Sequence, residues 1–485
     1  MSAPLWSYDA LLKVTKGRRA GAAPDDVTGI SIDSRTLRPG DAFFAIKGDT
    51  HDGHDFVTLA LGKGASTAVV ADARLPGLGR AKGCLTIVDD VLDALRRLGI
   101  AARARSQAGI VAVTGSVGKT GTKEMLAATL GADGETHYSP ASFNNHWGVP
   151  LTLARMPLSA KYGVFEIGMN HAGEIEPLVK MVRPRVAVIT TVEPVHLEYF
   201  KSVKDIARAK AEIFLGLEEG GTAILNRDNA HYTLLAKLAK EAGVERVVSF
   251  GEHKKADIRL EDVCLKPECS CVSASVFGEA VSYKLGAPGR HVVQNSLAVL
   301  GAVSLLGADL AKACLALADI HAPRGRGERH VLALPRGGEA ILIDESYNAN
   351  PASMRAAIAL LGQAEVKKSG RRIAVLGDMR ELGKDSAKMH AGLAEAIDAA
   401  HVHAVFLAGP MMHALWDALP AGVRGGYAET AAALEPAVMK ALAPGDIVMV
   451  KGSNASRMGP LVDNIKARLL SRKSAAEDRQ EQETA

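Results

Sequence analysis

Apolar runs alternate with amphipathic stretches along most of the chain, which predicts strands and helices in turn. In the middle of the chain, uninterrupted apolar runs are typical of strands buried on both faces. These runs are 110–114, 162–167, 186–192 and 223–225, and helical patterns lie at 119–130, 174–182, 203–217 and 232–242. We therefore expect an α/β fold with a doubly wound, mostly parallel sheet and a ligand site at the carboxyl ends of its strands.

Two further α/β units flank this sheet. Strand-like runs at 29–33, 42–46, 67–71 and 85–88, followed by a helical run at 92–106, predict a small N-terminal domain. After the breaker-rich segment Pro323–Gly327 a Rossmann-like alternation restarts, with strands at 340–344, 372–376, 403–407 and 446–450 and helices at 353–361 and 386–399. The predicted domains are 1–108, 109–322 and 323–470, followed by a flexible tail at 471–485.

Composition narrows the function classes. A length of 485 residues fits three domains of about 150 residues. The net charge of +4, without a block of Lys and Arg, gives no reason to expect nucleic acid as a partner. Because the N-terminus lacks a signal-peptide pattern and no apolar run is long enough to span a membrane, we expect a cytoplasmic protein.

The five cysteines fit a reducing compartment. Cys264, Cys269 and Cys271 lie close together in the sequence, but their spacing lacks the second pair of a typical zinc site. Strand alternation explains them better, with Cys269 and Cys271 on one face.

The clearest chemical motif begins at the end of the apolar run 110–114. Thr114, Gly115, Ser116, Val117, Gly118, Lys119, Thr120 and Gly121 form a glycine-rich turn that opens a helix. Such a turn points backbone N–H groups at phosphate oxygens, while Lys119 reaches the terminal phosphates and Thr120 binds Mg²⁺. Val113 stands where the common P-loop has its first glycine, so this is a G-x-x-G-K-T variant. It predicts nucleotide binding.

Several polar residues follow other strands of this domain. Glu166 ends the run at 162–167, where a carboxylate beside a P-loop is placed to bind Mg²⁺. His196 follows another strand, near Glu193 and Glu198, and is either structural or a site residue. Lys210, taken alone, reads as a surface lysine on a helix. Asn144 and Asn145 precede a turn, where paired amides either cap a helix or bind polar substrate groups.

The C-terminal unit carries polar loops after three of its strands, at 344–351, 377–383 and 451–453. Loops of this kind predict a second ligand edge, on a different domain from the P-loop. In the N-terminal unit, the segment 49–56 is rich in Asp and His. Its spacing on a loop does not suit a metal site, so we interpret it as a polar turn.

In combination these motifs resemble the Mur ligases, the ATP-dependent amide-forming enzymes of peptidoglycan assembly. The resemblance covers about residues 30–460. Its motifs are Thr114–Thr120, Asn144, Asn145, Glu166, His196, Lys210, Asn295 and Arg326, with Asp33–Arg35, Lys47 and Asp52–Phe56 at the N-terminal end. Two further segments, Asp344–Pro351 and Leu376–Gly383, look like the branch of the family that adds a D-alanyl-D-alanine dipeptide.

The resemblance implies a reaction that builds a cell-wall precursor. ATP would phosphorylate the terminal carboxylate of UDP-N-acetylmuramoyl-tripeptide, and the amine of D-alanyl-D-alanine would displace phosphate from the acyl phosphate. The implied cofactors are ATP and Mg²⁺, with two metal ions. The implied partners are these small molecules alone, with no nucleic acid and no membrane span, and we expect a monomer.

The same resemblance assigns roles to residues. Thr120 and Glu166 would hold one metal ion, and His196 and a carbamylated Lys210 the second, with Lys119 also catalytic. Asn295 would contact adenine, Arg326 the phosphates, and Asp344 would close over the nucleotide. The implied substrate-binding residues are Ser34, Arg35, Lys47, Asp52, Gly53, His54, Asp55, Phe56, Asn144, Asn145, Tyr347, Asn348 and Asn350.

Two alternatives stay open at this point. Another amide ligase of the same superfamily, such as one that adds a single amino acid or extends folylpolyglutamate, would share the P-loop, Glu166 and Lys210. A nucleotide-binding regulator without catalysis would need neither Glu166 nor the loops of the C-terminal unit. The segment Tyr347–Pro351 favours the dipeptide-adding branch.

Overall fold

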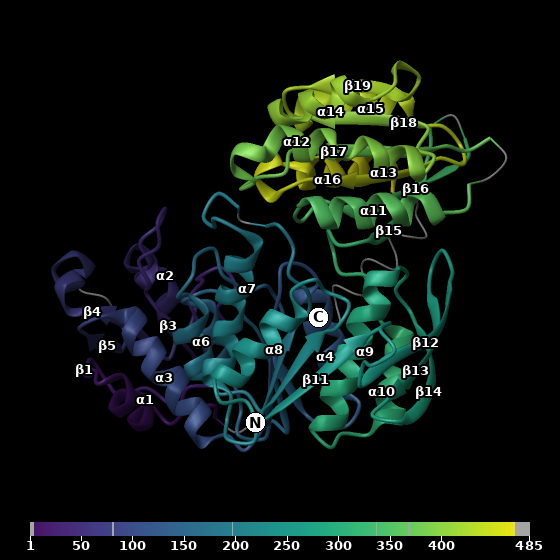
Figure 1. Cartoon of the computed structure of the whole chain (residues 1–485). Helices are drawn as coiled ribbons and strands as arrows, with labels where there is room; N and C mark the ends of the chain where they lie inside the picture. The colour runs from purple at the N-terminus through teal and green to yellow at the C-terminus, as the bar shows by residue number, and fades with distance from the viewer. Residues whose placement is uncertain (1–3, 80–81, 196, 336, 367–368, 471–485) are drawn as a thin grey trace.

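The computed structural model describes residues 4–79, 82–195, 197–335, 337–366 and 369–470, and the chain folds around three separate sheets (Figure 1). Figure 1 shows the purple N-terminal sheet beside the teal central sheet, and the green-to-yellow C-terminal sheet above them. The predicted α/β class and its three sheets are confirmed. None of the helices in the described ranges is long and apolar enough to cross a membrane.

The N-terminal sheet has five strands in the order β1-β5-β4-β3-β2, parallel except for β1. Its strands are β1 Arg18–Ala20, β2 Gly29–Ser31, β3 Asp41–Phe44, β4 Thr67–Ala71 and β5 Leu85–Val88. Its helices are α1 Tyr8–Thr15, α2 Val57–Gly62 and α3 Val91–Arg105. One face packs against the central domain, because Leu151 and Ala154 belong to the same hydrophobic core as Leu95 and Leu98 of α3.

The central sheet has nine strands in the order β14-β13-β12-β11-β10-β9-β6-β8-β7. Its strands are β6 Gly109–Thr114, β7 Thr136–Tyr138, β8 Tyr162–Glu166, β9 Val186–Ile189, β10 Thr222–Asn226, β11 Arg246–Gly251, β12 Ile258–Leu265, β13 Ser270–Val276 and β14 Glu279–Leu285. Its helices are α4 Lys119–Gly131, α5 Gly148–Ala154, α6 Ile175–Val182, α7 Val203–Ala211, α8 Tyr232–Glu241, α9 Arg290–Leu305 and α10 Leu310–Ala316. The pairs from β7 to β12 are parallel, and β12, β13 and β14 form an antiparallel extension.

Both faces of the parallel part are covered by helices. Along β6, Ile110 and Ala112 enter one core, whereas Val111 and Val113 enter the core on the opposite face. This alternation explains why the strand is apolar at every position. It also fixes the loop that follows Thr114 at the carboxyl edge of the sheet.

The C-terminal sheet has six strands in the order β15-β16-β20-β17-β18-β19. Its strands are β15 Glu328–Ala333, β16 Glu339–Glu345, β17 Arg372–Gly377, β18 Ala404–Ala408, β19 Arg424–Ala428 and β20 Ile447–Lys451. Its helices are α11 Pro351–Gln363, α12 Ser386–Ala391, α13 Ala394–Ala399, α14 His413–Ala418, α15 Ala431–Ala441 and α16 Met458–Leu469. All pairs are parallel except β15 with β16.

Some predicted elements differ from the structure. The helix predicted at 203–217 ends at Ala211 and continues as a 3-10 turn, Glu212–Gly216, and the helix predicted at 386–399 is divided into α12 and α13. The strand predicted at 186–192 ends at Ile189. Cys269 precedes β13, so it does not share a strand face with Cys271, whose cross-strand partner is Cys264. The predicted tail at 471–485 lies outside the described residues.

Candidate functional site

The P-loop follows β6 and opens α4, as predicted. Gly115 and Gly118 have φ of +156° and +85°, which favour glycine. A Cβ atom on Gly115 would lie 1.9 Å from Thr190 Oγ1, and one on Gly118 would lie 2.6 Å from Asn295 Nδ2. Thr190 Oγ1 in turn donates a hydrogen bond of 2.6 Å to the Val117 carbonyl. The loop shape is therefore fixed by neighbours that follow later in the chain.

Thr120, Glu166 and Asn144 form one connected group at the end of the P-loop. Thr120 Oγ1 donates a hydrogen bond of 2.9 Å to Glu166 Oε2, and Asn144 Nδ2 donates one of 2.7 Å to Glu166 Oε1. Glu166 is 4% exposed. Three oxygen-bearing side chains thus converge where the nucleotide phosphates are expected, and hard oxygen donors are the ligands that Mg²⁺ prefers.

The buried Lys123 explains how Asn144 reaches this group. It lies on α4 one turn after the P-loop and is 0% exposed. Its Nζ donates hydrogen bonds of 2.5 Å to the Ser139 carbonyl and 3.5 Å to the Ala141 carbonyl. The segment that leads to Asn144 is therefore attached to the P-loop helix. Sequence reasoning missed this lysine, because its partners lie 16 and 18 residues away.

Two lysines approach each other near the P-loop. Lys119 Nζ donates a hydrogen bond of 2.8 Å to the Gly115 carbonyl. Lys210, on α7, is 2% exposed, and burial together with the charge of Lys119 holds the pKa of its amine well below the ordinary value. Desolvation also lowers the pKa of Lys119, although Glu166 opposes this. The expectation of a surface lysine at 210 is wrong, since the residue faces inward.

The predicted ligand His196 lies outside the described residues. Its loop contacts the C-terminal domain nevertheless, because Glu198 N donates a hydrogen bond of 3.2 Å to the Glu381 carbonyl. This contact joins the loop to the segment Gly377–Gly383, which the sequence placed at the second ligand edge.

A pocket of about 550 Å³ lies between the central and C-terminal domains. It is lined on one side by the P-loop, Glu166 and Asn295, and on the other by the hinge residue Arg326 and by Tyr347. The guanidinium of Arg326 lies 4.1 Å from the centre of the Tyr347 ring. The pocket therefore brings together predicted nucleotide residues from two domains.

Asp344 is not part of this lining, whereas its neighbour Glu345 is. Asp344 is 3% exposed and accepts a hydrogen bond from Ser346 N. Glu345 accepts a hydrogen bond of 3.0 Å from Lys451 Nζ, which also donates to the Asn348 carbonyl at 3.0 Å. His291 lines the same pocket. Sequence reasoning missed Glu345, Lys451 and His291 as individual site residues.

A second pocket of about 710 Å³ adjoins the first. The two share six residues in their linings, Ser116, Lys119, Asn170, Tyr347, Asn348 and Asn350. The second pocket adds two arginines of the C-terminal domain, Arg380 and Arg457. It also adds Ser453, which is 4% exposed and whose Oγ has no hydrogen-bond partner among the described residues. The paired cations and the free hydroxyl favour an anionic group there.

Asn145 and Asn350 have structural partners. Asn145 Oδ1 accepts a hydrogen bond of 2.9 Å from Gly148 N at the start of α5. Asn350 is the N-cap of α11, where its Oδ1 accepts from Ser353 N at 2.9 Å and Ser353 Oγ accepts from Asn350 N at 3.0 Å. Asn350 therefore caps α11 at the edge of both pockets, whereas Asn145 holds the turn that leads into α5.

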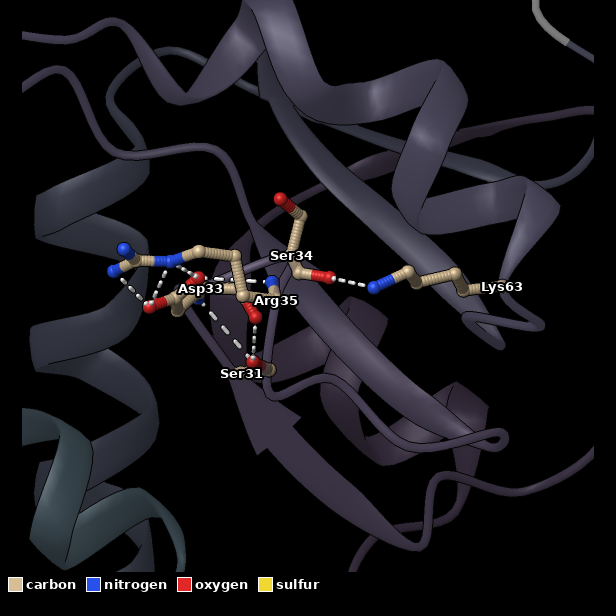
Figure 2. Close-up of polar contacts among 5 residues, drawn as sticks. All are labelled: Ser31, Asp33, Ser34, Arg35 and Lys63. Carbon is tan, nitrogen blue, oxygen red and sulfur yellow. Dashed lines mark hydrogen bonds and ion pairs between the residues drawn. The ribbon is translucent and has the colours of Figure 1, made fainter.

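The N-terminal candidates lie apart from both pockets, neither of which is lined by a residue before Ser116. Figure 2 shows Arg35 folded back onto Asp33, with Nη2 2.7 Å from Oδ2, and Lys63 donating a hydrogen bond of 2.8 Å to the Ser34 carbonyl. Arg35 lowers the pKa of the Asp33 carboxyl. The Arg35 side chain is 87% exposed, so its guanidinium keeps donors free for a ligand.

In the segment 49–56, which the sequence analysis interpreted as a polar turn, Asp52 caps a short 3-10 helix, Gly53–Phe56. Asp52 Oδ1 lies 2.6 Å from His54 Nδ1 and accepts from His54 N, and His54 Nε2 accepts from Ala71 N at 3.0 Å. Both ring nitrogens of His54 are therefore occupied. The backbones of Lys47 and Asp52 form an isolated antiparallel β-bridge. Gly53 packs so closely on Ala45 that a Cβ atom on Gly53 would lie 2.7 Å from the Ala45 backbone. Asp55 and Phe56 are exposed.

Comparison with known proteins agrees with this geometry. Three family models match: "Mur ligase family, catalytic domain" at residues 26–77, "Mur ligase middle domain" at 113–303, and "Mur ligase, glutamate ligase domain" at 330–454. The UDP-N-acetylmuramoyl-tripeptide--D-alanyl-D-alanine ligase of Escherichia coli is 34% identical over 459 residues, which is 93% of this chain and 96% of that protein. The ligase of the same name from Rickettsia prowazekii is 31% identical and covers 90% of this chain and 94% of its own.

Solved structures give the same result. The crystal structure of MurF from Acinetobacter baumannii superposes with a TM-score of 0.82, at 28% identity, over 95% of this chain and 98% of that one. The similarity thus extends over all three sheets and both sides of the pocket. The chain belongs to the Mur ligase family.

Proposed function

We propose that this chain joins D-alanyl-D-alanine to the terminal carboxylate of UDP-N-acetylmuramoyl-tripeptide, with conversion of ATP to ADP and phosphate. This would be the last cytoplasmic step in the synthesis of the peptidoglycan precursor. The observation that carries the proposal is that the two pockets adjoin. The first contains the P-loop and the Glu166 carboxylate, the second contains two arginines, and Lys119 lines both. The relatives named above carry this activity in their names.

The chemistry follows from the weakness of a carboxylate as an acyl donor. The tripeptide carboxylate attacks the γ-phosphorus of ATP, so the bond to ADP breaks and an acyl phosphate forms. The dipeptide amine then attacks the acyl carbon, loses a proton and expels inorganic phosphate. Lys119 offsets negative charge on the transferred phosphoryl group, and such electrostatic stabilisation dominates phosphoryl transfer.

Thr120 and Glu166 fit a Mg²⁺ ion, because their oxygens already converge 2.9 Å apart beside the P-loop. When bound, the ion would neutralise phosphate charge. Asn144 fixes the carboxylate by donating to its other oxygen. We further propose two Mg²⁺ ions, the second held by His196 and Lys210.

For Lys210 we propose carbamylation. A buried amine with a lowered pKa loses its proton at a lower pH than a surface lysine does, and a neutral amine attacks CO₂ to form a carbamate with release of a proton. The product places an anion beside Lys119 where a cation would otherwise stand. The electrostatic repulsion between the two lysines is thereby replaced by attraction. The oxygens of the carbamate suit a second metal ion.

The remaining roles are proposed from position. Asn295, beside the P-loop, would contact adenine, and Arg326 would contact the phosphates. Asp344, which lies outside the pocket lining, would close over the nucleotide with the loop that follows it. Tyr347, Asn348 and Asn350 line both pockets and would close over nucleotide and dipeptide, with Arg380 and Arg457 toward the dipeptide carboxylate.

The UDP end would bind the N-terminal domain through Ser34, Arg35 and the turn Asp52–Phe56. A substrate with UDP at one end and a peptide at the other is long enough to bridge separate sites. We propose domain boundaries at 108/109, just before β6, and at 322/323, between β14 and β15. We also propose a monomer that acts in the cytoplasm, where ATP and UDP-linked substrates are available.

One isotope experiment tests the reaction. UDP-tripeptide with ¹⁸O in its terminal carboxylate is incubated with ATP, Mg²⁺ and either D-alanyl-D-alanine or single amino acids. We expect ADP formation only with the dipeptide, and one ¹⁸O atom in each phosphate released. Glu166→Gln should stop turnover without unfolding. Release driven by a single amino acid, or phosphate without the label, would overturn the proposal.

A further inference from the structure

Three side chains of metal-ligand type gather at the start of the C-terminal domain, directly after the hinge. Glu328 and His330 lie on β15 two residues apart, so they share one face of the strand. Asp344, on β16, is the register partner of Glu328. One ligand atom from each lies within 4.8 Å of the other two. Within the described part of the chain, this is the one such group of three or more His, Cys, Asp or Glu side chains.

The polar atoms that face one another in this group are not satisfied by hydrogen bonds. His330 Nε2 and Glu328 Oε2 are both buried and have no hydrogen-bond partner among the described residues. They lie 3.2 Å apart, so the distance suits a hydrogen bond but the angles do not. The His330 side chain is 1% exposed. Buried polar atoms without partners are rare in folded proteins, and a bound ion is one group that satisfies them.

Two basic side chains, Lys466 and Arg324, lie close enough to Glu328 to stabilise its carboxylate electrostatically. Arg324 also pairs with Asp463, at 2.7 Å. Asp344 contributes a second carboxylate, of which one oxygen accepts from Ser346 N at 3.0 Å.

Glu328 and His330 have no part in the proposed reaction, and only Asp344 is shared with the nucleotide role proposed above. None of its three residues lines either pocket. Thr120 and Glu166, proposed for Mg²⁺, belong to the central domain. The Glu328 side chain is 23% exposed, which leaves the group a path to solvent.

We propose that Glu328, His330 and Asp344 bind one divalent transition-metal ion of the Zn²⁺ type. One imidazole and two carboxylates form a ligand set of known metalloprotein type, and the imidazole favours Zn²⁺ over Mg²⁺ or Ca²⁺, which select oxygen ligands. The ion would take the lone pairs of His330 Nε2 and Glu328 Oε2, and water would complete its coordination. It would join β15 to β16 beside the hinge, as a structural ion that the ligase reaction does not consume.

Zinc content and thermal stability of the full chain test the proposal without an activity assay. Protein free of metal and nucleotide is dialysed against Zn²⁺, and the bound metal is measured by inductively coupled plasma mass spectrometry. All variants carry Cys264→Ser and Cys271→Ser, which remove two exposed thiols, and Glu166→Gln, which weakens the P-loop site. We expect one Zn²⁺ per chain and a raised unfolding temperature.

His330→Gln and Glu328→Gln should each lower Zn²⁺ affinity about 10-fold or more, because even outer partners of metal ligands contribute 10–100-fold. Glu339→Gln is the matched control, since Glu339 lies exposed on β16. Circular dichroism shows whether each variant is folded. Absence of Zn²⁺ from the background protein, or equal affinity in all three variants, would overturn the proposal. Neither result bears on the ligase reaction, which the isotope experiment tests separately.

Discussion

At the scale of single residues, Lys210 is the side chain whose surroundings differ most from what its type suggests. Its amine is enclosed by protein, and Lys119 is its nearby charged neighbour. Burial and the charge of Lys119 are the two influences on its pKa, and no acidic side chain of the described residues is among them. A buried cation without an anion destabilises the folded state, so the amine releases its proton or acquires a negative group.

The first prediction concerns stability against pH in CO₂-depleted buffer. Because the folded pKa of Lys210 lies well below 10.5, the unfolded chain binds more protons between those two values. Stability therefore rises with pH across this window, by up to about 1.4 kcal/mol per pH unit, and is lost as pH falls toward the folded pKa. Lys210→Met removes this term. The unfolding temperature of the native chain should gain on that of the variant from pH 7.5 to 9.5.

Lys204→Met is the matched control, because Lys204 lies exposed on the same helix. Its unfolding temperature should follow that of the native chain at every pH. Parallel curves for the native chain and Lys210→Met would contradict a lowered pKa at Lys210.

The second prediction concerns activity. Lys210→Ala leaves a space where the carbamate would stand, and a small carboxylate such as acetate has a similar anionic group. We expect turnover to fall strongly in Lys210→Ala and to recover in part with added short-chain carboxylic acids. Ligation rates measured with and without acetate provide the check, with sodium chloride as the salt control. A variant that gains nothing from any carboxylic acid would count against the carbamate.

At the scale of elements, the start of α11 shows one residue serving a helix and a pocket together. Asn350 and Ser353 form a reciprocal capping box, and Pro351 occupies the first turn. Both features satisfy or avoid the free N–H groups at a helix start. The cap thereby holds Tyr347 and Asn348, which precede it, at the rim of both pockets.

The third prediction follows from this cap. Asn350→Ala removes the acceptor for Ser353 N and should destabilise the C-terminal domain by about 1 kcal/mol. Asn350→Asp keeps an acceptor and should restore stability. Asn348→Ala is the control, since Asn348 Oδ1 accepts only from its neighbour Ala349 N in the described residues. Urea unfolding followed by circular dichroism measures all three. Equal stability of Asn350→Ala and the native chain would exclude the capping role.

The predicted elements were accurate where burial is local and failed where it is not. Strands β4 and β5 match their predicted ranges residue for residue, because each is a continuous apolar run between breakers. Strand β15, with the sequence Glu-Arg-His-Val-Leu-Ala, was missed because its burial alternates and its polar half lies against other elements. Strand β19 is an edge strand that contains Gly425 and Gly426, so it carries little sequence signal.

The candidate site shows the same division. The P-loop and Glu166 could be predicted from the sequence, because each lies at the end of a strand that the apolar pattern predicts. Thr190 and His291 were missed, and Lys451 was predicted only as part of the loop 451–453, because their roles depend on contacts across long separations. Lys451, for example, meets Glu345, which lies 106 residues away. A motif records local structure, whereas these contacts exist only after the sheets have formed.

At the scale of the whole molecule, the three sheets are not equally connected. The N-terminal and central domains share a hydrophobic core through Leu151 and Ala154. The C-terminal domain instead has two cores composed only of its own residues. Its links to the central domain include polar contacts, such as the hydrogen bond of 2.5 Å from Arg329 Nη1 to the Pro267 carbonyl. Polar links that water can replace permit the C-terminal domain to move as a body about Pro323–Gly327.

The last prediction is that this movement closes the two pockets over their substrates. Within the hinge, Gly325 has φ of +71°, and a Cβ atom there would lie 2.9 Å from Tyr347 Cβ. Gly325→Ala should therefore strain the hinge and displace Tyr347 from the pocket rim. Gly307→Ala is a close control, because Gly307 has the same φ of +71° but nothing within 4 Å of its Cβ position. It bears the backbone strain without the clash.

Small-angle scattering measures the outcome. The radius of gyration of the native chain and of Gly307→Ala should fall when a non-hydrolysable ATP analogue and UDP-tripeptide are added together. Gly325→Ala should contract less and turn over more slowly. Because the P-loop and the arginines of the second pocket stand on bodies with separate cores, ligands that touch both favour the contracted form by their difference in affinity for the two forms. Scattering curves that are identical with and without ligands would show that the pockets are already assembled, and the hinge would then have no role in catalysis.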